Sequence, residues 1–469
     1  MDEKPYYGDS CPIAACATAL AISALSVIRV SGRGSIEMAA NAFSRPLALT
    51  KTPGNTVVYG WILEPSTNGQ TESARQKIDE VLVSVYRAPA SYTGEDGLDI
   101  TCHGGSAAGT AVLNALFRAG FRKALPGEFS FRAFVNGRID LTAAEGVMEI
   151  VGAKSDKGRQ NAIGRLCGTL EKEINSIKTV LVSVLSEMEL LLDYSEIDGI
   201  SGGDSGSTLI HTVTKAKERL TRLADSYKTQ RLYQDGALVV IAGRPNAGKS
   251  SIFNLLLKEE RSIVTEIPGT TRDWIEAWVS INGIPVRLAD TAGLRESTDI
   301  VEKLGIERSR SLLEGAHLVL YVIDGCTGIT QEDEQFIYDG DNKENTIAIW
   351  NKNDIAPHGT KDDYIALCAT TGDGLDTLTK KITSYFLSQK LNMDTETGGA
   401  SLGTDRQKAL IESAIENINE MLTMSHNDLP LDLISPVLRA AVDNLGFITG
   451  EVSTADILET MFCKFCVGK

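Results

Sequence analysis

The sequence predicts a multidomain α/β protein: an N-terminal α+β domain, then a discontinuous α-helical domain into which a doubly wound parallel-sheet domain is inserted. Three observations support this. Strand-like and helical runs alternate from residue 237 to about 386, as in a parallel sheet covered by helices. Helical periodicity flanks that segment on both sides, and neither flank can bury its apolar face alone. Short β-like runs and turns fill the first 125 residues.

Residues 27–30, 57–61 and 81–86 carry the β-like runs of the N-terminal domain. Apolar residues from Leu166 to Leu191 recur at three- and four-residue spacing and predict one long amphipathic helix. A Gly/Ser-rich patch at 199–207 breaks the pattern before a second helix over 207–232. Helical periodicity returns at 410–422 and 437–445. We therefore expect domains at 1–125, 126–228 (helical, first part), 229–391 (α/β) and 392–469 (helical, second part).

The composition limits the functions that the chain can have. Its 46 Lys+Arg against 62 Asp+Glu give a net charge of −16, which argues against a simple basic nucleic-acid binder. A nucleic-acid substrate held by a local patch or a partner stays open. The eight cysteines are scattered, which favours reduced thiols in a cytoplasmic protein. The uncharged stretch 10–28 follows acidic residues and ends at Arg29, so it is a poor signal peptide or membrane span.

Residues 243–250 fit the phosphate-loop pattern G-x-x-x-x-G-K-[ST], between a buried strand (237–242) and a helix (251–257). The glycines let backbone N–H groups approach phosphates, Lys249 neutralises the β- and γ-phosphates, and the Ser250 hydroxyl ligates Mg²⁺. A chance Gly-rich turn is the alternative, but the Lys-Ser pair and both flanks weigh against it. We assign nucleotide binding to Asn246, Ala247, Gly248, Lys249, Ser250 and Ser251.

Three later segments follow in the order that such a domain needs. Asp290 ends a strand and can hold Mg²⁺ through water, and Gly293 can meet the γ-phosphate; Thr291 and Ala292 lie between them. In the run Asn351, Lys352, Asn353, Asp354, the last carboxylate can accept both the N1–H and the amine of guanine, which selects GTP over ATP. Thr271 lies in the run PGTTRD (268–273) and offers a further Mg²⁺ ligand. Between these segments, Asn282-Gly283 predicts a hairpin turn.

Asn246 in the phosphate loop, with PGTTRD and DTAGLRES downstream, resembles the TrmE-Era-EngA group of GTPases. About 230 residues precede this domain and the chain ends FCVGK, which resembles the MnmE (TrmE) family of tRNA-modification GTPases. The likeness includes TGED (93–96), HGG (103–105), PGEFSFRAF (126–134) and LGFITGE (445–451). It implies a folate-binding-like N-terminal domain and a Ras-like P-loop G domain inserted into the helical one.

Leu294 follows DTAG where Ras-like proteins carry a water-positioning glutamine. The resemblance implies that K⁺ supplies positive charge between the phosphates. Its ligands would be Asn246, Thr265, Ile267 and Thr270, of which Thr265 and Thr270 also belong to the GTP site. Glu302 matches the family's water-orienting glutamate. The alternative is a solvated carboxylate at a helix start.

The family also implies a folate site, for 5-formyl- or methylene-tetrahydrofolate, at Arg29, Asp99 and Arg138. Two departures are visible: the family usually has Glu where Asp99 stands, and residues 20–23 replace its Pro-Gly-Arg-Gly turn. The alternative is three ordinary surface charges. Cys466 matches the family's functional thiol, with a buried small apolar residue as the alternative. Cys463 then belongs to neither a zinc nor a redox pair.

The resemblance implies a homodimeric, GTP-hydrolysing component of a complex that modifies the wobble uridine of tRNA. With an FAD-dependent partner of the MnmG/GidA family, as a heterotetramer, it would add an aminomethyl-type group at C5. Folate would supply the carbon, and a K⁺-dependent GTPase cycle would drive G-domain dimerisation. Two alternatives stay open: a ribosome-assembly GTPase of the Era/EngA type, and a folate-binding scaffold with a degraded G domain.

Overall fold

The computed structural model describes residues 7, 9–65, 75–193, 205–259, 261–262, 276–290, 312–339, 343–357, 364–388, 399–452 and 455–468. It forms two compact units. The first comprises Met1–Met148, Arg165–Val213 and Ser413–Lys469, and the second comprises Glu149–Gly164 and Thr214–Glu412. Each unit is therefore assembled from segments that are far apart in the sequence.

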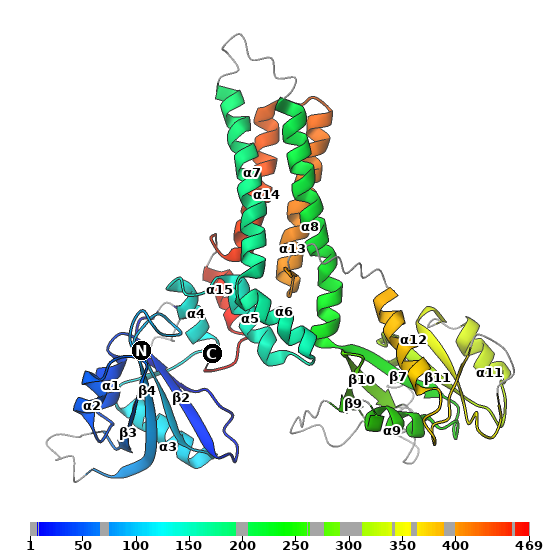
Figure 1. The fold of residues 1–469 in the computed structure, drawn as a ribbon. Helices are drawn as coiled ribbons and strands as arrows, with labels where there is room; N and C mark the ends of the chain where they lie inside the picture. The colour runs from blue at the N-terminus through cyan, green and yellow to red at the C-terminus, as the bar shows by residue number, and fades with distance from the viewer. Residues whose placement is uncertain are drawn as a thin grey trace. The chain divides into compact units, whose positions relative to one another are not determined.

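The first unit contains a six-stranded sheet in the order β3-β4-β5-β2-β1-β6, of which β2, β3 and β4 are labelled in Figure 1. Its pairs are antiparallel except β1 with β6. Apolar residues of α1, α2 and α3 cover one face, as expected for an α+β domain. The elements are β1 (Ile13–Cys16), β2 (Leu25–Ser31), α1 (Ser35–Ala40), α2 (Pro46–Lys51), β3 (Thr56–Leu63), β4 (Lys77–Tyr86), β5 (Gly97–His103), α3 (Ser106–Arg118) and β6 (Arg122–Lys123).

Helices from both ends of the chain meet in the first unit. α7 (Thr169–Asp193) packs along α14 (Leu431–Thr449), and Figure 1 shows the two side by side. Lys178 pairs with Glu451, and Arg439 pairs with Glu189. The predicted helical domain made from both flanks is confirmed in this pairing. The other helices outside the α/β segment are α4 (Glu128–Val135), α5 (Leu141–Gly152), α6 (Asp156–Leu166), α8 (Ser205–Asp235), α13 (Asp405–His426) and α15 (Ala455–Phe462).

The second unit contains a seven-stranded sheet in the order β13-β12-β11-β7-β10-β9-β8. β7, β10, β11, β12 and β13 run parallel, whereas β9 and β8 are antiparallel additions at one edge. The elements are β7 (Ala237–Gly243), α9 (Lys249–Glu259), β8 (Arg261–Ser262), β9 (Glu276–Ile281), β10 (Ile284–Asp290), β11 (Leu318–Asp324), α11 (Gln331–Glu334), the π-helix η3 (Gln335–Asp339), the 3₁₀-helix η4 (Lys343–Asn345), β12 (Thr346–Asn351), β13 (Ile365–Ala366) and α12 (Leu375–Ser388).

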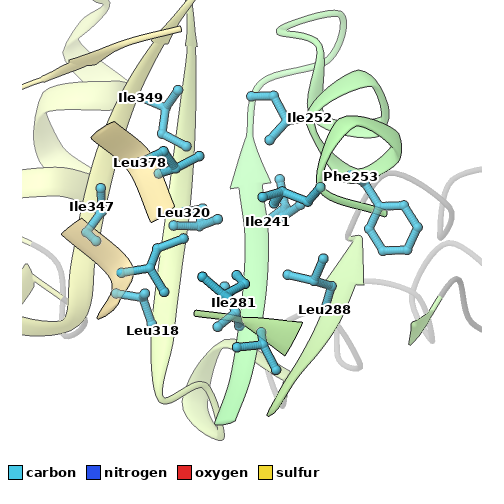
Figure 2. Packing of buried hydrophobic residues seen from close by; sticks show 14 of the residues in the cluster. Ile241, Ile252, Phe253, Ile281, Leu288, Leu318, Leu320, Ile347, Ile349 and Leu378 are labelled. Atoms are coloured by element: carbon cyan, nitrogen blue, oxygen red, sulfur yellow. The ribbon is translucent and has the colours of Figure 1, made fainter. Parts of the chain in front are cut away.

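Both faces of this sheet are buried. On one face, residues of α9 and α12 such as Ile252, Phe253 and Leu378 pack on Ile241 and Leu320 of the strands (Figure 2). On the other face, Phe336 of η3 belongs to a second cluster. The chain order reverses on either side of β7, so β7 ends at the topological switch point where such sheets bind ligands.

Most predicted elements are confirmed, with two corrections. The hairpin forms at Asn282 and Gly283, which have φ of 49° and 84°, as a tight primed turn requires. Leu166 ends α6 instead of belonging to the long helix, because Gly168 (φ 79°) breaks the chain direction before α7. The helix predicted to begin at residue 207 begins earlier, because α8 starts at Ser205, inside the predicted Gly/Ser-rich break at 199–207.

The uncharged stretch at 10–28 contains β1 and most of β2, which pair with each other. Within the residues that the structure describes, no helix is both long and apolar enough to span a bilayer. All eight cysteines are unpaired, as predicted. Domain boundaries at 125, 228 and 391 stay a prediction.

Candidate functional site

The phosphate loop joins β7 to α9, and its backbone needs the residues that the sequence provides. Gly243 has φ 137°, and a Cβ there would collide with the Val322 carbonyl. Gly248 has φ 95°, and a Cβ there would meet the Asn351 side chain. Asn246 also takes a left-handed conformation, with φ 63°, which Asn tolerates better than most residues. The loop therefore keeps its backbone N–H groups within reach of a phosphate.

Lys249 and Ser250 lie where phosphate and metal chemistry require them. Lys249, only 8% exposed as a residue, donates its ammonium to the carbonyls of Gly243 (3.0 Å) and Arg244 (2.8 Å). The Ser250 hydroxyl donates to Asp290 Oδ2 at 2.8 Å. A hydroxyl in the first turn of α9 and a carboxylate at the end of β10 form an oxygen donor set that suits Mg²⁺. Three of the predicted residues are thus brought together.

The predicted guanine segment is tied to the phosphate loop. The Asn351 amide, 2% exposed, donates to the Ala247 carbonyl (2.8 Å) and accepts from the Ala369 N–H (3.2 Å). Lys352, with φ 63°, pairs with Asp324 at 2.7 Å. Asp354 is exposed, so its carboxylate is accessible to a base. Ser251 is also exposed and lies in the first turn of α9.

Eight predicted site residues lie outside the described part of the chain, and the structure places none of them. They are Thr265, Ile267, Thr270, Thr271, Thr291, Ala292, Gly293 and Glu302. The potassium loop, the second magnesium ligand and the water-orienting glutamate therefore stay predictions.

A buried carboxylate beside the phosphate loop was missed at the sequence level. Asp333, 1% exposed, accepts from the Tyr321 hydroxyl (2.9 Å) and from both the N–H and hydroxyl of Thr330 (2.9 and 2.8 Å). Arg244 of the loop lies 3.9 Å from the same carboxylate. Burial, followed by the hydrogen bond to Asp333, raises the pKa of Tyr321. The T-x-x-D spacing of 330–333 is a capping-box signal that could have found it.

A second site lies in the first unit, where Arg29 of β2 and Asp99 of β5 are directly opposite each other on neighbouring antiparallel strands. The Arg29 guanidinium donates twice to the carboxylate, at 2.9 and 3.3 Å, and lies 5.6 Å from the Tyr92 ring centroid. Burial disfavours the charged form, but the hydrogen bond and charge of Asp99 outweigh it, so the pKa of Arg29 is raised. The pair lines a cavity of about 200 Å³.

Arg138 lies at an adjoining cavity of about 380 Å³, where its Nε donates to the Ser91 carbonyl at 3.1 Å. The two cavities share Tyr86, Ser91 and Tyr92 in their walls. The three predicted folate residues are therefore brought to one region, in which charged groups flank aromatic rings. Such a mixture of apolar walls and few polar groups is typical of small-molecule sites.

The C-terminal tail reaches this region, which the sequence did not reveal. The Cys466 carbonyl accepts from the Gly127 N–H at 3.3 Å. Two residues later, the Gly468 carbonyl lies 3.5 Å from Arg29 Nη1. Cys466 itself is exposed, so the alternative of a buried apolar residue is wrong. Phe462 and Phe465 anchor the tail in an apolar cluster with Leu141 and Ala144.

Comparison with known proteins covers nearly the whole chain. A model of the TrmE GTP-binding protein N-terminus matches residues 12–138, and a model of the MnmE helical domain matches residues 141–466. A tRNA modification GTPase MnmE from Treponema denticola is 40% identical, covering 98% of each chain. Those from Carboxydothermus hydrogenoformans and Borrelia turicatae are 37% and 38% identical, over 97% of this chain and 99% and 98% of theirs. With the phosphate loop and the Arg29 region on one chain, these matches mean that the chain belongs to the MnmE (TrmE) family of tRNA modification GTPases.

Proposed function

We propose that this chain hydrolyses GTP as a component of a tRNA-modification system in the cytoplasm. The observation that carries the proposal is the position of the phosphate-loop Lys249 next to Ser250, which bonds to Asp290, at the switch point of the sheet. This arrangement can bind a nucleoside triphosphate together with Mg²⁺. Full-length likeness to MnmE proteins favours this role over that of a ribosome-assembly GTPase.

We assign Asp354 to the recognition of guanine, with Asn351 and Lys352 supporting the base. Thr271 would ligate Mg²⁺, and the Gly293 N–H would meet the γ-phosphate. K⁺ would add positive charge between the phosphates, held by Asn246 and the loop with Thr265, Ile267 and Thr270. Glu302 would orient the attacking water. Because Asn246 is exposed, its amide oxygen is accessible as a ligand.

The second part of the proposal concerns the modification itself. The Arg29–Asp99 pair and Arg138 would bind 5-formyl- or methylene-tetrahydrofolate in the adjoining cavities. The exposed Cys466 would act beside that site, since its tail contacts Arg29 through Gly468. A homodimer would work with an FAD-dependent partner of the MnmG/GidA family on tRNA wobble uridines. The acidic net charge of −16 fits a chain whose partner supplies basic surface to tRNA.

Mass spectrometry of tRNA tests the function. A strain that lacks the chain should lose the modification at the wobble uridine, and the wild-type gene should restore it whereas Lys249→Ala should not. Lys258→Ala, at the far end of the same helix, is the matched control and should restore it fully. Unchanged wobble uridines in the deletion strain would overturn the proposal.

GTPase rates test the hydrolytic assignments. Hydrolysis should be several-fold faster in KCl than in NaCl, and equal rates would exclude the potassium assignment. Glu302→Ala should abolish hydrolysis with little change in nucleotide affinity, because a water-orienting group acts after binding. Loss of nucleotide binding in that variant would instead indicate a structural role.

A further inference from the structure

The TGED run (93–96) contributes to the wall of the cavity that holds Arg29 and Asp99, although no role was assigned to it above. Thr93 lines this cavity together with Ser31 of β2. Both residues are almost completely buried, at 3% and 2% exposure. Buried hydroxyls need hydrogen-bond partners, so the direction in which each one donates decides what the wall offers to a ligand.

The partners fix these directions. Glu95 is ion-paired with Arg132 at 3.2 Å, and an ionised carboxylate only accepts hydrogen bonds. Ser31 must therefore donate its single proton to Glu95 Oε2, at 2.8 Å. The Ser31 and Thr93 oxygens are 2.7 Å apart, and with the Ser31 proton already used, Thr93 is the donor in that bond. Thr93 Oγ1 in turn accepts from the Glu95 N–H at 3.3 Å.

Two further side chains of the cavity, Ser91 and Arg29, have donors engaged by other protein groups. The Ser91 hydroxyl donates to the Glu95 carbonyl at 2.5 Å. The Arg29 guanidinium donates to both oxygens of Asp99 and points Nη1 at the Gly468 carbonyl. The hydroxyls of Ser31, Thr93 and Ser91 therefore have their protons engaged, and like the Asp99 carboxylate they can only accept hydrogen bonds from a ligand. The remaining wall contains Phe129 and Leu98, which are fully buried and apolar.

We infer that Ser31 and Thr93 form an acceptor-only wall that selects a flat heterocycle presenting N–H donors. This inference rests on the proposed folate function, and it assigns the two hydroxyls to the 2-amino and N3–H edge of a reduced pterin. A ring that presented only acceptors at this edge would place lone pair against lone pair. Replacement of an amine by a methyl group would leave a buried acceptor without a partner.

Binding calorimetry on the full chain tests the inference with two probes. They are 5-formyltetrahydrofolate and its analogue in which a methyl group replaces the 2-amino group. We expect the wild-type chain to bind the amino form about tenfold more tightly, as one buried hydrogen bond allows. Thr93→Val keeps the side-chain shape and removes the oxygen. It should weaken binding of the amino form by about tenfold and bring the ratio between the probes close to one.

Thr101→Val is the matched control, because Thr101 belongs to the same strand as Asp99 but does not line the cavity; it should change neither value. If Thr93→Val melts at a lower temperature, Ser31→Ala replaces it with the same expectation. If the affinity ratio between the two probes is the same in the variant as in the wild-type chain, with or without weaker binding of both, the acceptor wall is wrong and the folate proposal still stands. Failure of the wild-type chain to bind either probe would overturn the folate proposal and this inference with it.

Discussion

Removal of one hydroxyl beside the phosphate loop should measurably lower the free energy of unfolding of the second unit. The Tyr321 hydroxyl donates to Asp333 Oδ1 at 2.9 Å, in a site where the carboxylate is 1% exposed. Tyr321→Phe deletes that donor and keeps the ring, which is 6% exposed and stacks on Phe336 with centroids 4.5 Å apart. A hydrogen bond to a charged group contributes about 1.5–3 kcal/mol. The two Thr330 donors remain on Oδ2, so we expect a loss of about 2 kcal/mol.

Urea unfolding, followed by tryptophan fluorescence, measures this loss. Tyr338→Phe is the matched control, because the Tyr338 hydroxyl contacts only the Tyr364 hydroxyl among the described residues and the side chain is 47% exposed. Its effect should stay within about 0.5 kcal/mol, as for most surface substitutions. If Tyr321→Phe unfolds with the same midpoint and slope as the control, then the buried Asp333 does not depend on that donor and the reasoning is wrong.

Three further predictions follow from single contacts. Asp354→Asn should reduce GTP affinity and favour xanthosine triphosphate in competition assays, because an amide can donate to the carbonyl that replaces the guanine amine; unchanged preference would remove Asp354 from the base site. His317 accepts the Leu238 N–H at 3.0 Å, and burial, then Arg287, lowers its pKa below 6.5. The unfolded chain therefore takes up the proton first, so the free energy of unfolding should fall as pH drops through about 6.5, and His317→Asn should flatten that slope. Gly468→Ala would place a Cβ 2.8 Å from the Ala17 backbone, so the tail should shift and the Gly127 amide should exchange faster; Gly137→Ala, also at positive φ but in open space, should leave that exchange unchanged.

The parts of the fold that could be predicted are those with a local sequence signal. The run of apolar residues before Gly243, the G-K-S end of the loop and the Asn-Gly turn each depend on a few adjacent residues. The structure forms β7, α9 and the β9–β10 hairpin at these places. β5 and α3 were not predicted: β5 has an alternating pattern in Leu98, Ile100 and Cys102 that was not used, and small residues dilute the apolar pattern of α3.

The arrangement around Arg29 shows why the rest of the site could not be predicted. Asp99 meets Arg29 because β2 and β5 are neighbours in the sheet, and the tail meets it across 439 positions of the chain. Both contacts join residues that are far apart in the chain, so no local periodicity or motif spacing in the sequence indicates them. A family resemblance can identify Cys466 as a functional thiol, but its exposed position follows from packing. Phe462 and Phe465 are buried in the apolar cluster, whereas Cys466 is exposed outside it and the Gly468 carbonyl lies at the guanidinium. Arg29 has five N–H donors, of which three contact Asp99 and the Gly468 carbonyl, so two remain for a ligand while the tail keeps its contact.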